Sequence, residues 1–330
     1  MPLRWRATTA SSSPNKPLSS FANAAMLWLS VGSASGKTTK GGGSAAAPAH
    51  AGGGLARAVG ACPKMEHPDD PNRPPWVPDH EFAGFATQLA TQYASGTILV
   101  IGANEGKVGT DPSFDMLRSK QAEHLHKVFV EPVPYLFKRL EQNIKTMARA
   151  SAWNVAVTNQ SAWLNIFCFG LDADHGPGKR WPDKLRGSSW VPSVQREGRS
   201  WWSQICSLDR ERLYKATARD FSRTPREALD EFVTKARVRG VTVPTLLEMT
   251  TRDRPVRSVQ IDVEGFDDIV LKALPLGKRH AGVDFRPASI VFEHNVLSTE
   301  RVLNATDWLR RRGCWACREG QNIVALAVPN

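Results

Sequence analysis

Short apolar runs alternate with helical segments from Pro74 to the end of this 330-residue chain. The runs at 96–102, 127–132 and 288–295 are continuous, which is typical of strands buried on both faces of a sheet. Neighbouring parallel strands need a long crossover between them, and a helix usually supplies it. The alternation therefore predicts an α/β fold with a doubly wound, mostly parallel sheet.

The apolar patterns place each expected element on a residue range. We expect further strands at 150–159, 162–170, 257–262 and 322–328. We expect helices at 111–125, 134–148, 207–220, 225–240 and 264–274. Residues 171–204 are rich in Gly, Pro and Trp and are expected to form a loop.

The first 65 residues contain no Asp or Glu and are rich in Ser, Ala and Gly. Such a composition cannot bury enough apolar surface to offset its ordering entropy. We therefore expect residues 1–73 to be a disordered targeting segment and linker, and residues 74–330 to form the domain. The composition suits an organellar transit peptide, while the apolar run at 21–31 suits a secretory signal. That run is too short to cross a bilayer, which takes about 20 apolar residues, so no integral membrane span is expected.

The net charge of +11 is spread unevenly, with +5 in residues 1–75. No run of Lys and Arg with interleaved aromatic residues marks a nucleic-acid track, so we expect no nucleic-acid partner. The five cysteines are odd in number and scattered, and "CWAC" (Cys314 to Cys317) has no second pair. They are expected to be ordinary buried cysteines rather than a disulfide framework or a metal site.

Polar residues follow four of the apolar runs: "GANEG", "VEP", "IDVEG" and "FEHN". In a doubly wound sheet, ligands lie outside the carboxyl ends of the strands. Glu131 ends the second run, 29 residues beyond Gly102, where an acid can accept hydrogen bonds from both hydroxyls of a ribose. Because "GANEG" is not GxGxxG, the turn suits S-adenosylmethionine better than a dinucleotide. The alternative is a plain strand–turn–helix corner.

The other two strand ends carry groups that can move protons. Asp262 and Glu264 flank the end of one run, where a carboxylate can orient a nucleophile, take its proton or hold a metal. Asp262 can instead simply cap the following helix. Glu293 and His294 end another run, and His294 is either a base or a packed histidine.

The order of these motifs, with "VEPVPYLFKRLEQNI", "VPTLLEM" and "QIDVEGFDDIVLKAL", resembles the FkbM-type methyltransferases. The resemblance runs from about Ile98 to the C-terminus, with an atypical insert at about 171–240. It implies a class I methyltransferase-like fold and S-adenosylmethionine as the cofactor.

The resemblance also assigns site residues. Asp262 would face the transferred methyl group, with His294 as the second candidate for accepting a proton. The residues implied to hold the cofactor are Gly102, Asn104 and Gly106 at its methionine part, Glu131 at the ribose, and Asn154 and Ala156 near the adenine. No metal ligand is implied. The family usually has an acid where this chain has Val100, and Asn104 or Glu105 are the residues that can compensate.

The resulting expectation is O-methylation of a hydroxyl on a small molecule or a glycan. Two alternatives stay open: an NAD-dependent oxidoreductase, and a catalytically inactive protein on the same fold. The oligomeric state is left open.

Overall fold

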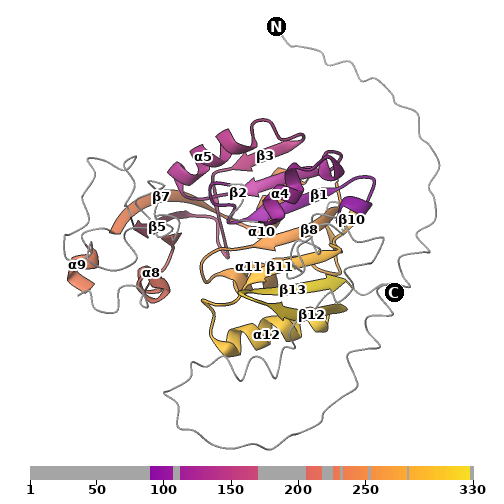
Figure 1. Ribbon diagram of the computed structural model, residues 1–330. Coiled ribbons are helices and arrows are strands. Elements are labelled where there is room, and N and C mark those ends of the chain that lie inside the picture. Colours follow the sequence, from indigo (N-terminus) through magenta and orange to yellow (C-terminus); the bar gives the residue numbers. More distant parts are fainter. Residues whose placement is uncertain are drawn as a thin grey trace, which may run out of the picture. The chain divides into compact units, whose positions relative to one another are not determined.

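The structure is a computed structural model that describes residues 90–106, 112–169, 206–217, 226–230, 233–251, 254–280 and 282–327 (Figure 1). The predicted N-terminal segment 1–73 and the predicted loop 171–204 lie outside the described residues. None of the helices in the described ranges is both long and apolar enough to cross a membrane.

A seven-stranded sheet forms the centre of the described domain, in the order β12-β13-β11-β8-β1-β2-β3. Its strands are β1 (Thr97–Ile101), β2 (His126–Val130), β3 (Ala150–Trp153), β8 (Val256–Ile261), β11 (Ser289–Glu293), β12 (Cys314–Glu319) and β13 (Asn322–Ala327). Five neighbouring strands, from β3 to β11, are parallel, and β13 runs opposite to the other six strands of this sheet. The doubly wound, mostly parallel sheet predicted from the sequence is confirmed.

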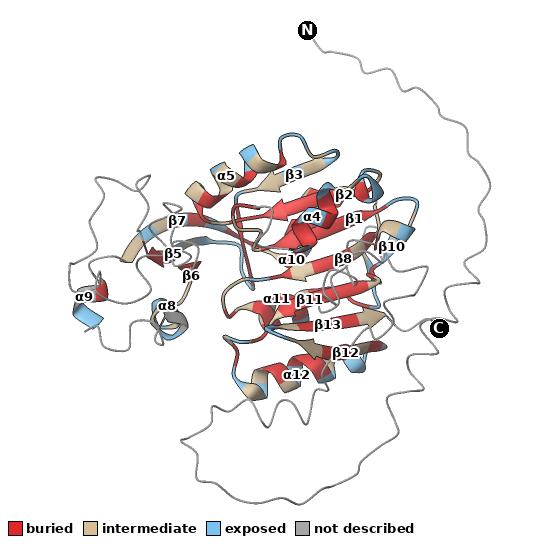
Figure 2. Cartoon of the chain, in the orientation of Figure 1, coloured by how far each residue is buried: buried red, intermediate tan, exposed pale blue. Residues whose placement is uncertain are grey.

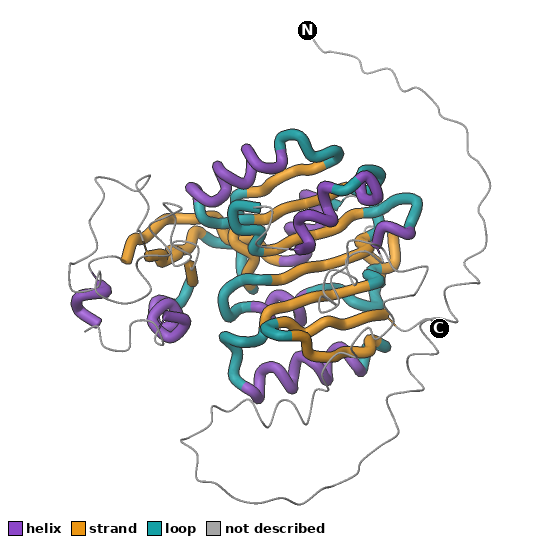
Figure 3. Tube along the Cα trace, in the orientation of Figure 1, coloured by secondary structure: helices purple, strands orange, loops and turns teal. Residues whose placement is uncertain are grey.

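Helices cover both faces of this sheet, as its two-sided burial requires (Figures 2 and 3). On β1, Ile98 and Val100 pack with residues of α4 (Pro112–Arg118) and α5 (Pro134–Ile144). The alternating Leu99 and Ile101 pack with residues of the opposite layer, which holds α10 (Val243–Thr250), α11 (Asp267–Ala273) and α12 (Thr299–Arg310). The remaining short elements are η1 (Ala90–Gln92), η2 (Lys120–Ala122), β9 (Arg279–His280) and β10 (Val283–Asp284).

The strand order reverses between β1 and β8. From β1 the chain moves outward through β2 to β3, then crosses to β8 on the other side of β1 and continues to β11. This is the topological switch point, outside which ligands of doubly wound proteins bind.

A second sheet lies beside the first, in the order β4-β7-β5-β6. Its strands are β4 (Ala156–Thr158), β5 (Trp163–Phe169), β6 (Cys206–Ser207) and β7 (Val233–Thr242). The strand predicted at 150–159 is therefore wrong as one element, because β3 and β4 belong to different sheets. Asn154 separates them: its side-chain amide donates to the carbonyls of Glu131 and Pro132 at 2.8 and 3.0 Å.

The helix predicted at 225–240 is also wrong over most of its length. Only α9 (Arg226–Asp230) is helical, and the chain enters β7 at Val233. Along β7 the exposed Lys235, Arg237 and Arg239 alternate with more buried residues, which is the period of two that a strand requires. The helix predicted at 207–220 is present in part as α8 (Arg210–Thr217).

The cysteine prediction needs correction as well. Cys168 on β5 and Cys206 on β6 are paired residues of neighbouring antiparallel strands, and they form a disulfide. Cys317 is disulfide-bonded too, whereas Cys314 is a free, buried thiol. Burial raises the pKa of Cys314 to about 11. The two cysteines of "CWAC" therefore do not act as a pair.

Candidate functional site

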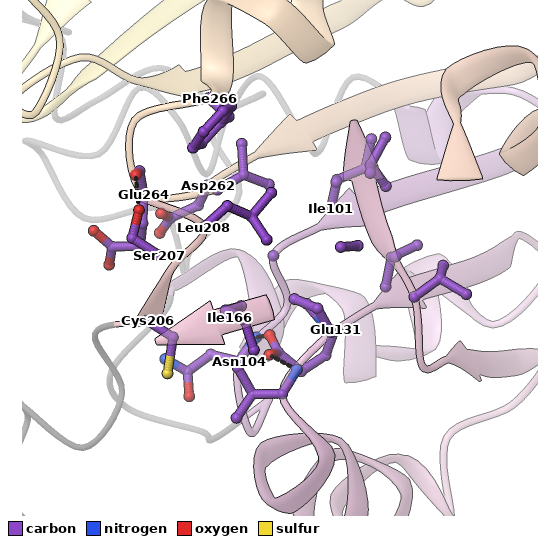
Figure 4. Close-up of a pocket in the computed structure, with 18 residues that line it drawn as sticks. Ile101, Asn104, Glu131, Ile166, Cys206, Ser207, Leu208, Asp262, Glu264 and Phe266 are labelled. Atoms are coloured by element: carbon purple, nitrogen blue, oxygen red, sulfur yellow. Dashed lines mark hydrogen bonds between the residues drawn. The ribbon is translucent and has the colours of Figure 1, made fainter. Parts of the chain in front are cut away.

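The carboxyl ends of β1, β2 and β8 meet β4, β5 and β6 around one pocket (Figure 4). It encloses about 650 Å³ of space that no atom fills, part of it open to solvent. One part of its lining is apolar and includes Val133, Val155, Val157, Ile166 and Leu208. The other part carries polar groups: Asn104, Glu131, Ser207, Asp262 and Glu264. The mixed lining, apolar walls with a few polar groups, is typical of a small-molecule site.

The turn after β1 is shaped by close contact with the end of β8. Gly102 has φ +83°, and a Cβ there would collide with the backbone carbonyl of Asp262. Gly106 has φ +57°, and its Cβ would collide with Leu140 and Phe114. Gly102 lines the pocket and Gly106 does not. Both glycines are thus required by packing within the protein, before any ligand is considered.

Asn104 connects this turn to Glu131. Its φ of +53° is one that asparagine tolerates better than most residues. Its backbone N–H donates to Glu131 Oε2 at 2.8 Å, and the N–H of Val133 donates to Oε1 at 2.9 Å. A carboxylate offers about four acceptor positions, so each oxygen can still accept a further hydrogen bond. Burial, more than any neighbouring charge, raises the pKa of Glu131 to about 7.

Of the two residues predicted to compensate for the missing acid at Val100, only Asn104 lies at the pocket. Val100 is buried among the apolar residues below α4 and α5, on the side of β1 opposite to Ile101. Glu105 is buried beside Arg139 of α5, at 3.6 Å, and does not line the pocket. Asn104 does line it.

Of the two residues predicted near the adenine, only Ala156 lines the pocket. Asn154 is exposed, and its side-chain amide serves the backbone of Glu131 and Pro132. Asn154 therefore acts on the pocket indirectly, by fixing the turn that carries Glu131.

The segment after β8, residues 262–266, is called here the acid turn. Asp267 braces it, since its carboxylate accepts the N–H of Val263 at 3.2 Å and that of Gly265 at 3.0 Å. The N-cap of α11 is Phe266. The alternative in which Asp262 merely caps this helix therefore does not hold, and Asp262 lies exposed at the pocket.

Three carboxylates gather beside the pocket: Asp262, Glu264 and Glu293 have oxygens within 4.8 Å of one another. Glu264 reaches this position with φ +51°, a strained value for a residue other than Gly, Asn or Asp. Burial, then the charges of Asp262 and Asp267, raise the pKa of Glu264 well above its usual value. Burial and the charges of Asp262 and Glu264 raise the pKa of Glu293 to about 10. The cluster can retain a proton at neutral pH, or offer oxygen ligands to a hard divalent cation.

His294 does not line the pocket. Its Nε2 lies 3.1 Å from the carbonyl oxygen of Gly320, and its backbone N–H donates to the backbone carbonyl of Gln321 at 2.8 Å. Consecutive strand residues point in opposite directions, so only one of Glu293 and His294 can face Asp262. That residue is Glu293, and His294 packs against the turn between β12 and β13.

Sequence reasoning also missed the part of the lining that comes from the insert. Cys206, Ser207 and Leu208 form one wall of the pocket. No motif marks these residues, because they reach the site through the pairing of β6 with β5.

Comparisons with known proteins identify no family for this chain. No family model matches it, and no curated protein matches it. Among solved structures, it is similar to a precorrin-6y C5,15-methyltransferase from Geobacter metallireducens GS-15, at 10% identity and a TM-score of 0.31. The match covers 77% of this chain and 92% of the other. A likeness this weak carries no argument about function, and the FkbM resemblance stays a prediction.

Proposed function

We propose that this protein is a methyltransferase that uses S-adenosylmethionine. One observation carries the proposal: the described residues that line the pocket include Glu131, Asp262 and Glu264 but no Lys or Arg. The absence of a cationic side chain from these residues disfavours a pyrophosphate, which needs positive charge or clustered N–H donors. Carboxylates that are only partly ionised at neutral pH still favour a ligand with a cationic reactive end. S-adenosylmethionine carries a sulfonium and an ammonium group, whereas NAD carries a pyrophosphate.

The residues present also fit the rest of this cofactor. Glu131 keeps acceptor capacity on both oxygens and ends β2, which suits a ribose diol. The apolar lining around Ala156 and Ile166 suits an adenine base. Gly102 and Asn104 line the same pocket, and we assign the methionine part of the cofactor to them.

When bound, the cofactor supplies an activated methyl group. The protein's own contribution would be to orient the acceptor, to exclude water and to hold the proton that the acceptor loses. Asp262 is exposed at the pocket and is the residue that we assign to the acceptor. Glu264 and Glu293 have raised pKa values, so the cluster can keep a proton near neutral pH.

We further propose that the acceptor is a hydroxyl on a small molecule or a glycan. A hydroxyl is a poor nucleophile until its proton has an acceptor, and carboxylates at the pocket can provide one. An NAD-dependent oxidoreductase and a catalytically inactive binding protein are the competing functions, and the charge of the lining argues against the first.

Thermal unfolding with S-adenosylhomocysteine, with NAD and without ligand separates these functions. Ligand at 100 times its dissociation constant stabilises by about 2.7 kcal/mol, which shifts the Tm by several degrees. We expect the shift with S-adenosylhomocysteine alone. A shift with NAD alone would identify an oxidoreductase. Incubation with methyl-labelled cofactor and cell extract then tests the acceptor, because label should enter the small-molecule or glycan fraction and not protein.

A further inference from the structure

The acid turn is held from two sides. Asp267 accepts its N–H groups from below, as described above. From the insert, Ser207 Oγ donates to the carbonyl of Glu264 at 3.4 Å, and Arg212 Nη1 donates to the next carbonyl, that of Gly265. Two successive carbonyls of the turn are thus bonded to one short segment of the insert, residues 206–212, called here the wall.

Arg212 is the strongest link between the wall and the turn. Gly265 has φ +94°, and a Cβ at this position would collide with the guanidinium of Arg212. The same guanidinium lies 5.3 Å from the ring centre of Phe266, which lines the pocket. Arg212 Nε lies 3.4 Å from Asp209, which orients the side chain from within the wall.

The wall itself is fixed to the second sheet. Cys206 is joined to Cys168 by the disulfide, and Ser207 pairs with Phe167 of β5. The N–H of Asp209 donates to Ser207 Oγ at 3.2 Å, which directs the hydroxyl proton of Ser207 to Glu264. The wall therefore connects β5 to the backbone that directly follows the Glu264 side chain, at the carbonyls of Glu264 and Gly265.

We propose that Arg212 is a positioning residue for the acid turn. This assignment rests on the proposed function, and it deepens that function by giving the insert a role in the reaction. Arg212 holds the carbonyl of Gly265 and the ring of Phe266, so that Asp262 and Glu264 stay directed at the pocket. Arg301 of α12 also donates to Gly265, at 3.0 Å, but it binds Asp268 as well and so ties α12 to α11.

Hydrogen exchange of the ligand-free protein tests this positioning without any assumption about the reaction. In Arg212→Ala, the peptide that covers 262–266 should exchange at least about tenfold faster, the size expected for one lost hydrogen bond to a charged group. Exchange in β1 and β11 should not change. Arg210→Ala is the matched control, because Arg210 lies on the same helix and binds Asp230 at 2.9 Å instead. Unchanged exchange at 262–266, or equal acceleration in Arg210→Ala, would overturn the proposal.

Methyl transfer provides the second measurement. Misplaced catalytic groups can cost about 10²-fold in rate, so the maximal rate of Arg212→Ala should fall about 10- to 100-fold. The KM for S-adenosylmethionine should stay within about threefold, and Arg212→Lys, which keeps the charge, should recover part of the rate. A rate equal to that of wild type would overturn the proposal. If wild type transfers no methyl group at all, the proposed function fails, while the exchange result still decides the role of Arg212.

Discussion

From the carboxylate cluster we predict that the stability of this protein falls as the pH rises above neutrality. Glu264 and Glu293 have pKa values raised above those of the unfolded chain, to about 10 for Glu293. At pH values between the unfolded-state and folded-state pKa, these carboxyl groups hold protons in the folded protein that they have released in the unfolded chain. Stability must therefore fall as the pH rises through this interval.

The magnitude follows from the number of protons retained. Each one lowers the free energy of unfolding by about 1.4 kcal/mol per pH unit, so one proton costs about 2 kcal/mol between pH 6.5 and 8. Burial raises the pKa of Glu131 and of Asp267 to about 7, so these two groups add to the loss of stability in the lower part of this window. Burial lowers the pKa of Lys127 to about 8 and lowers that of His294 from its usual value, so these two groups act in the opposite direction near the upper and the lower end of the window.

Glu264→Gln is the perturbation that tests this reasoning. The variant removes one of the three carboxylates. Its free energy of unfolding should fall by about 1 kcal/mol less than that of wild type between pH 6.5 and 8. Urea unfolding followed by circular dichroism at pH 6.5, 7, 7.5 and 8 measures the difference. Glu248→Gln, at an exposed position of α10, is the control and should follow wild type. A wild-type stability that stays level or rises from pH 6.5 to 8 would refute the cluster's assigned protonation.

Three further predictions follow from single positions. Gly102→Ala should cost about 3 kcal/mol or more in urea unfolding, because it meets both an unfavourable φ and the carbonyl of Asp262. Gly282→Ala, with φ +82° and open space around it, should cost only about 1 kcal/mol, and equal costs would contradict the steric argument. Asp262→Asn should keep S-adenosylhomocysteine affinity within a few-fold in calorimetry while methyl transfer falls about 10²- to 10⁴-fold; normal turnover would remove Asp262 from the mechanism. Cys206→Ser should lower the free energy of unfolding by about 2–4 kcal/mol, since the disulfide spans 38 residues, and an unchanged urea midpoint would contradict this.

The central sheet could be predicted because its strands are buried on both faces. Runs such as 97–101 and 289–293 are apolar or neutral at nearly every position, and a short run of this kind is typical of a strand buried on both faces. At β7 the structure differs from the predicted helix for a different reason. Its charged residues alternate with small and apolar ones, but the preceding helix α9 made a continuous helix look plausible. The period of two at Lys235, Arg237 and Arg239 is the feature of the sequence that indicates a strand here.

The sequence predicts those residues of the candidate site that directly follow a strand of the central sheet. Glu131 and Asp262 directly follow β2 and β8, so topology alone brings them to one pocket. The choice between Glu293 and His294 depends on which residue ends β11 facing Asp262, and the sequence leaves that register open by one residue. Ser207 and Leu208 reach the pocket through a strand of two residues, too short to produce a pattern.

Binding of S-adenosylhomocysteine through Glu131 is the measurement that tests the account most directly. Calorimetric titration at pH 8, where Glu131 with its pKa of about 7 is mostly ionised, should show one site in wild type and no binding of NAD. The affinity should be at least about tenfold weaker in Glu131→Gln, because hydrogen bonds to a charged group contribute about 1.5–3 kcal/mol. Glu141→Gln, at an exposed position of α5, should bind as wild type does. Absence of binding to wild type, or equal affinity in wild type and Glu131→Gln, would contradict the assignment of this pocket to S-adenosylmethionine.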